Sequence, residues 1–204
     1  MALITDIREA RGLVEIEAEG TLALRVRKAH YAKCPLTPGE DVDLEAYAGR
    51  LAAAQFADAY EAALTSLDYS ARTAKEISAA LRRKGFVEPC VEAVINRLIE
   101  NRLIDDVRYA QRMAETQSGK AVGVFAFKRK LRAKGISEDD AQQAMELFDD
   151  AQQADAARIA AEKLWRRYSG LPSREARAKL SQALARRGFP WEAIESAIDA
   201  LQEE

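Results

Sequence analysis

The residues of this chain best suited to chemistry are basic side chains gathered in one short segment. Positions 128–134 read KRKLRAK, and Val124, Phe127 and Leu131 follow helical spacing on the side opposite the charges. A basic arc over an apolar stripe suits a nucleic-acid backbone, because each neutralised phosphate releases counterions and adds affinity without sequence choice. A charged segment is also commonly an ordinary solvated surface. On this segment alone, both interpretations stand.

Two further basic clusters hold the equivalent place in an internal repeat. The pattern occurs three times, as LRRKGF at 81–86, LRAKGI at 131–136 and LARRGF at 184–189. The glycines, Gly85, Gly135 and Gly188, lie 50 and 53 residues apart. Such a period is typical of repeat proteins, in which each unit buries its apolar face by stacking on a neighbour. Repetition would place the basic residues along one side of the stack.

The repeated motif predicts the end of one helix and the start of another. The glycine suits a left-handed residue just after the helix, the basic residue before it complements the negative helix end, and the apolar residue after it folds back onto the last turn. The next helix carries apolar residues at matching offsets, namely Val91, Ile95 and Leu98, then Ala141, Met145 and Phe148, then Ile194, Ile198 and Leu201. A third helix precedes each pair, at about 56–67, 107–117 and 154–168. Three three-helix units in tandem predict an elongated, curved body.

The first forty residues follow a different pattern. Val14, Ile16 and Ala18 alternate with charged residues, which is the period of half-buried strands. Segments 4–9, 13–18 and 21–27 therefore predict a small antiparallel β meander, and Asp43 is the expected N-cap of the first helix. We expect a mainly α fold with a β-rich domain at 1–42, a linker helix at 43–55, and repeats at 56–104, 105–150 and 151–204.

Groups that could support catalysis or bind a metal are sparse. Cys34 and Cys90 form no CxxC pair and lie far in sequence from any ligand cluster, and His30 has no companion at useful spacing. The N-terminus lacks the apolar run of a signal peptide, and no stretch approaches about eighteen apolar residues. We therefore expect a cytoplasmic protein that is not an enzyme and needs no metal or cofactor.

Two other groups of residues have structural interpretations. Asp105 and Asp106 resemble a paired-carboxylate site, but their place before a helical pattern favours a helix N-cap. Trp165, Tyr168 and Trp191 fall at helix-like positions, and we expect core or interface packing before base stacking. The net charge of −2 divides into −5 over residues 1–68 and +3 over 69–204. This modest basic bias does not establish nucleic-acid binding by itself.

The ordered motifs together resemble the RecX family. They are SARTAKEI at 70–77, LRRKGF at 81–86, LIENRLIDDVRYA at 98–110, KLRAKGI at 130–136 and ARRGF at 185–189. The resemblance covers about residues 56–204. It implies a monomer of three tandem modules, lodged in the groove of a filament of RecA recombinase on single-stranded DNA. It further implies a negative modulator of recombination, DNA repair and the SOS response, which lowers ATP turnover and strand exchange and hinders repressor self-cleavage.

The resemblance and the repeat together give the expected contact residues for RecA or DNA. These are Arg72, Arg82, Arg83, Lys84, Arg108, Lys128, Arg129, Lys130, Arg132, Lys134, Arg186 and Arg187. The alternative is a free-standing protein that uses one three-helix unit like a helix-turn-helix in transcription, and it predicts sequence-dependent binding to duplex DNA. A nuclease or hydrolase would need a ligand cluster that the sequence does not contain. The role of the N-terminal meander stays open, as a binding element or as a cover for the first repeat.

Overall fold

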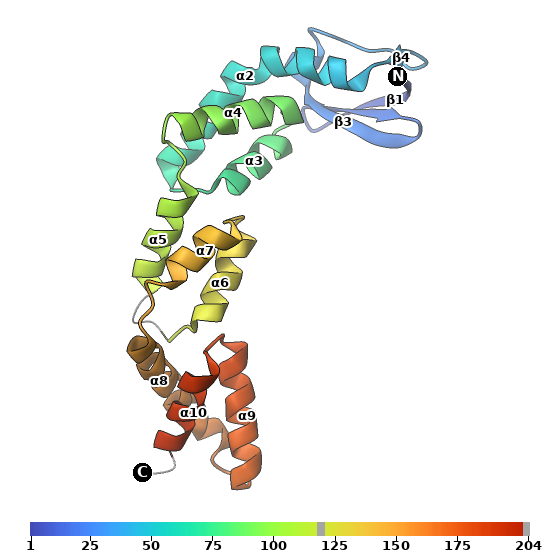
Figure 1. Cartoon of the computed structure of the whole chain (residues 1–204). Helices are drawn as coiled ribbons and strands as arrows, with labels where there is room; N and C mark the ends of the chain where they lie inside the picture. Colours follow the sequence, from blue (N-terminus) through green and yellow to red (C-terminus); the bar gives the residue numbers. More distant parts are fainter. Residues whose placement is uncertain (118–120, 202–204) are drawn as a thin grey trace. The chain divides into compact units, whose positions relative to one another are not determined.

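The computed structural model describes residues 1–117 and 121–201 (Figure 1). The chain divides into two compact units, Met1–Asp105 and Asp106–Glu204, and each is described by itself. The sequence also predicts a connector between two helices at 118–120, and these residues lie outside the described ones.

The first unit begins with the predicted meander. It consists of β1 (Ala2–Ala10), β2 (Leu13–Ala18) and β3 (Thr21–Arg27), all antiparallel. Arg11-Gly12 and Glu19-Gly20 have positive φ at both positions, as in the tight hairpin turns whose twist matches that of the strands. A strand that the sequence analysis did not anticipate, β4 (Asp41–Val42), pairs with β1 and completes the order β3-β2-β1-β4.

Four helices follow in the first unit: α1 (Lys28–Tyr31), α2 (Leu44–Tyr69), α3 (Ala74–Arg83) and α4 (Glu88–Glu100). Asp43 caps α2 as predicted, because its Oδ1 accepts the Ala46 N–H at 3.0 Å. The helix α2 continues without a break across the expected boundary between a linker at 43–55 and a repeat starting at 56. Residues of the sheet, including Val14 and Val26, share one apolar core with helical residues, including Leu81 and Leu98.

The second unit contains α5 (Asp106–Gln117), α6 (Val124–Ala133), α7 (Glu138–Met145), α8 (Asp150–Tyr168), α9 (Ser173–Arg186) and α10 (Trp191–Ala200). It has two apolar clusters. One surrounds Phe127, whose ring centroid lies 4.9 Å from that of Phe148. The other surrounds Leu180, Leu184 and Ile194. The mainly α fold with three three-helix repeats and an N-terminal sheet is thus confirmed.

The glycine motif ends all three second helices in the same way. Gly85, Gly135 and Gly188 have φ of +82°, +86° and +83°. The residue after each glycine donates its backbone N–H to the motif leucine, from Phe86 to Leu81 at 3.3 Å, from Ile136 to Leu131 at 3.1 Å and from Phe189 to Leu184 at 3.3 Å. This bond, with a second from the glycine N–H, is the Schellman motif. The predicted left-handed stop and its apolar latch are therefore confirmed.

Candidate nucleic-acid interface

The end of α9 meets the start of α6 through direct backbone contact. The Phe125 N–H donates to the Gly188 carbonyl at 2.9 Å, and the Gly123 N–H donates to the Arg187 carbonyl at 3.2 Å. A Cβ atom at Gly188 would lie 2.2 Å from the Ala126 nitrogen. Only glycine fits at this position, so the two helix ends have a fixed relation. Figure 1 shows the end of α9 beside the start of α6.

Two side chains strengthen this junction, which we call the α6–α9 junction (residues 123–132 and 186–188). Arg129 donates from Nη2 to the Arg186 carbonyl at 3.2 Å. Gln153, which is buried in α8, accepts the Val124 N–H on its Oε1 at 2.9 Å and so satisfies a free amide at the start of α6. Gln153 was not among the residues expected from the sequence to contribute to a site. Its signal is a lone glutamine on the alanine-rich buried face of α8.

The cations of α6 share one face at this junction. Lys128, Arg129 and Arg132 lie three, four and seven residues after Phe125, so the four side chains follow one helix face. Lys128 and Arg132 both form ion pairs with Glu138 of α7. Their hydrogen bonds lower the pKa of the Glu138 carboxyl, which therefore stays charged at neutral pH. This carboxylate holds the two cations in place.

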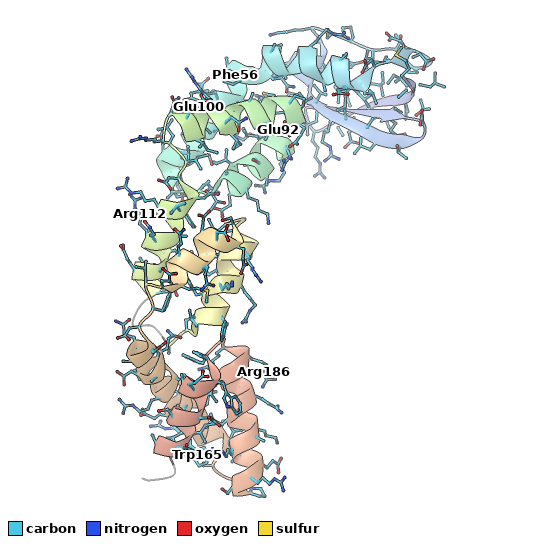
Figure 2. The ribbon with its side chains drawn as sticks, viewed as in Figure 1. Phe56, Glu92, Glu100, Arg112, Trp165 and Arg186 are labelled. Carbon is cyan, nitrogen blue, oxygen red and sulfur yellow. The ribbon has the colours of Figure 1, made fainter. Side chains whose placement is uncertain are left out.

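Other expected contact residues of the second unit differ in their surroundings. Arg186 and Arg187 are exposed and form no ion pair with any residue that the structure describes, and Figure 2 labels Arg186 near the end of α9. Lys130 is also exposed but lies on a different face of α6 from Lys128. Lys134 places its Nζ 5.3 Å from the centroid of the Tyr109 ring. Apart from Lys130, the junction has five cations: Lys128, Arg129, Arg132, Arg186 and Arg187.

The expected contact residues of the first unit are partly engaged in local contacts. Arg82 donates from Nε to Glu88 at 2.6 Å, in the same register as the Arg132–Glu138 pair, and this bond lowers the pKa of Glu88. Arg83 donates from Nε to the Ala79 carbonyl at 3.3 Å.

Three more of the expected contacts differ in exposure. Lys84 is exposed, whereas Arg72 is half-buried, and its Nε is buried without a hydrogen-bond partner among the described residues. In the second unit, Arg108 is exposed in the first turn of α5.

Of the residues considered for catalysis, His30 and Cys90 are buried. His30 is buried with its Nε2 3.2 Å from Asp58 Oδ2, and burial lowers its pKa, so the ring is neutral at pH 7. Burial raises the pKa of the Cys90 thiol to about 11, which keeps it from acting as a thiolate nucleophile. Across 1–117 and 121–201, no group of three or more His, Cys, Asp or Glu side chains could hold a metal ion. No helix in these ranges is long and apolar enough to span a membrane.

The tryptophans divide between packing and exposure. Trp165 packs against the apolar cluster of the third repeat, as expected. Trp191 is 58% exposed at the start of α10, so it does not belong to the core, and packing at an interface stays a prediction. At the position matching Glu88 and Glu138, the third repeat has Trp191, and at the position matching Arg82 and Arg132 it has Ala185. The ion pair of the first two repeats is therefore missing here, and the indole ring lies open beside Arg174 and Arg177.

Models of a protein family match each of the three repeats. They are the first three-helix domain of RecX at residues 59–98, the second at 105–145 and the third at 150–198. The chain belongs to the RecX family. A regulatory protein RecX from Limosilactobacillus reuteri (strain DSM 20016) is 32% identical over 98% of this chain and 77% of its own length. That of Bacillus subtilis (strain 168) is 30% identical over 71% of this chain and 55% of its own.

Solved structures of RecX proteins agree with this assignment. A crystal structure of regulatory protein RecX is 31% identical, covers 98% of this chain and all of its own, and has a TM-score of 0.69. The RecX structure from Lactobacillus salivarius is 33% identical over 74% of this chain and 99% of its own, with a TM-score of 0.67. The resemblance drawn from the sequence motifs is thereby confirmed, and the chain is a member of a family of regulatory proteins.

Proposed function

We propose that this chain is a negative modulator of RecA recombinase that binds the RecA–single-stranded DNA filament. In this proposal it acts in the cytoplasm as a monomer, without catalysis, and it inhibits ATP hydrolysis, strand exchange and the stimulation of repressor cleavage. The observation that carries the proposal is the match of all three repeats, in order, to the RecX domains. The implied partner is the filament, with DNA reached inside it.

The basic residues supply the contact surface in this proposal. A polyanionic filament offers phosphates and carboxylates, and fixed cations steer association with such a surface and set its orientation. The α6–α9 junction fits this task, because its five cations come from two repeats whose helix ends are hydrogen-bonded together. The exposed Arg83, Lys84, Arg108 and Lys130 would add further contacts.

The test is RecA-catalysed ATP hydrolysis on single-stranded DNA with this protein titrated at substoichiometric levels. Parallel assays without RecA measure its binding to the same single strand and to duplex DNAs of different sequence. The proposal predicts inhibition at concentrations well below those that saturate bare DNA. Unchanged ATP hydrolysis together with tight, sequence-dependent binding to duplex DNA would instead establish a free-standing transcription factor.

A further inference from the structure

The α6–α9 junction contains an exposed aromatic ring that its packing does not explain. Phe125 is 47% exposed, whereas Phe127, two residues later, is buried against Phe148. The core of this repeat thus takes the second phenylalanine and leaves the first at the surface. The backbone of Phe125 is held by its hydrogen bond to the Gly188 carbonyl, so the ring starts from a fixed point on the junction.

The charged side chains of α6, the helix that carries this ring, are all basic. Lys128, Arg129 and Arg132 share the helix face of Phe125, and Arg186 and Arg187 end the helix that contacts it. Of these five cations, two are paired with the single carboxylate of Glu138. Arg129, Arg186 and Arg187 form no ion pair within the described parts of the chain. An aromatic face inside a cationic field fits a ligand that carries both flat rings and regular anions.

We propose that Phe125 is a stacking platform for a base of single-stranded nucleic acid, with the flanking arginines of the α6–α9 junction on the adjacent phosphates. Single strands expose the faces of their bases, and aromatic side chains stack on them with little sequence preference. Duplex DNA keeps those faces stacked inside the helix, so it can use the arginines and not the ring. This inference rests on the proposed function, because it assigns the DNA contact within that activity.

The test compares three variants on a short fluorescein-labelled DNA strand and on the matching duplex, by fluorescence anisotropy without RecA. Phe125→Ala should weaken binding to the single strand about tenfold and leave duplex binding unchanged. Its salt dependence should match that of the parent protein, because no phosphate contact is lost. Phe125→Trp should restore affinity. Leu147→Ala, which removes another apolar side chain that is 49% exposed in the same unit, should have no effect.

Two results would overturn the stacking role. One is equal single-strand affinity for Phe125→Ala and the parent protein. The other is an equal loss on single strand and duplex. Unchanged DNA affinity with weakened inhibition of RecA would assign Phe125 to a protein contact instead. Circular dichroism checks that each variant is folded.

Testing the parent protein and Phe125→Ala also in the RecA ATP-hydrolysis assay separates this inference from the proposed function. If the parent protein inhibits RecA but Phe125→Ala binds DNA normally, stacking is refuted and the proposed function stands. If the parent protein leaves RecA unaffected while Phe125→Ala selectively loses single-strand binding, the proposed function is refuted and stacking stands.

Discussion

Gly85 and Gly188 end equivalent helices with the same turn, yet they pack against different elements. Gly85 accepts the Arg27 N–H at 3.2 Å, and a Cβ atom there would lie 2.6 Å from Leu13 Cδ2, so its neighbours are strands β3 and β2. Gly188 accepts from Phe125 of the preceding repeat. The N-terminal sheet therefore packs against the glycine turn of the first repeat, just as the second repeat packs against the glycine turn of the third. Terminal repeats need such a cover, because one apolar face otherwise lacks a neighbour.

The largest expected effect is on the glycines themselves. Gly188→Ala should lower the free energy of unfolding by about 3 kcal/mol, because it combines a left-handed φ with a backbone clash at 2.2 Å. Gly85→Ala should cost less, about 2 kcal/mol, because the nearest atom is the end of the flexible Leu13 side chain. Urea denaturation measures both.

Gly170→Ala is the matched control for these variants. Gly170 has open space around its Cβ position and no positive φ, so its replacement should leave the stability nearly unchanged. A Gly188→Ala protein as stable as Gly170→Ala would contradict the close contact of α6 with α9. A larger loss of stability for Gly85→Ala than for Gly188→Ala would contradict the expectation that the contact at Gly188 is the tighter one.

The repeat and its turns could be predicted from the sequence because they depend on local rules. A glycine after a basic residue and before a large apolar one specifies a helix end within six residues. The partner of each glycine could not be predicted, because Arg27 and Phe125 lie 58 and 63 residues away in the chain. The two-residue strand β4 was missed for the same reason, since its pairing with β1 is set by tertiary contacts and not by its own pattern.

Of the candidate interface too, some features could be predicted from the sequence and others could not. The repeated motif marks the cations of α6 and α9 as candidate contact residues, and their role in contacts stays a prediction. The ion pairs of Lys128 and Arg132 with Glu138 could not be predicted, because a carboxylate six or ten residues away gives no periodic signal. The exposure of Trp191 could not be predicted, because an apolar residue at a helical position usually faces the core, whereas the smaller Ala193, Ile194 and Ala197 take that face of α10.

A smaller effect is expected from the two buried glutamines. Gln55 accepts the Val87 N–H at 2.9 Å and donates to the Gly85 carbonyl at 3.4 Å, so Gln55→Leu leaves a buried amide unsatisfied and should cost about 2 kcal/mol. Gln153→Leu leaves only the half-buried Val124 amide without a hydrogen-bond partner, and it should lower the free energy of unfolding by about 1 kcal/mol. The exposed Gln182→Leu serves as control in the same denaturation series. Equal stability of all three variants would show that the hydrogen bonds of Gln55 and Gln153 do not stabilise the fold.

The smallest effect is an acid sensitivity confined to the first unit. Burial lowers the pKa of His30 from 6.5; Asp58 opposes this shift, and Arg27 and Lys33 add to it. The unfolded chain binds the proton more readily, so the contribution of His30 is complete above about pH 6.5 and is lost as the pH falls through 6.5 towards the lower folded value. His30→Gln, which does not titrate, should flatten this dependence in thermal melts.

The fluorescence of the protein locates this sensitivity. Trp165 and Trp191 are the two tryptophans of the chain, and both belong to the second unit. Mild acid should therefore lower the melting temperature seen by far-ultraviolet circular dichroism more than that seen by tryptophan fluorescence. An equal shift in both signals, or the same pH dependence in His30→Gln, would show that another group is responsible.

Reversing charge at the α6–α9 junction tests directly whether these cations bind the RecA filament. Arg129→Glu combined with Arg186→Glu is compared with Lys163→Glu combined with Arg166→Glu, two exposed cations of α8 that change the net charge equally. RecA-catalysed ATP hydrolysis on single-stranded DNA is the measurement, with circular dichroism confirming the fold of each protein. Because the junction variant loses fixed cations at the interface, about tenfold more of it should be needed for the same inhibition, while the control inhibits normally. Full inhibition by a folded junction variant would contradict it.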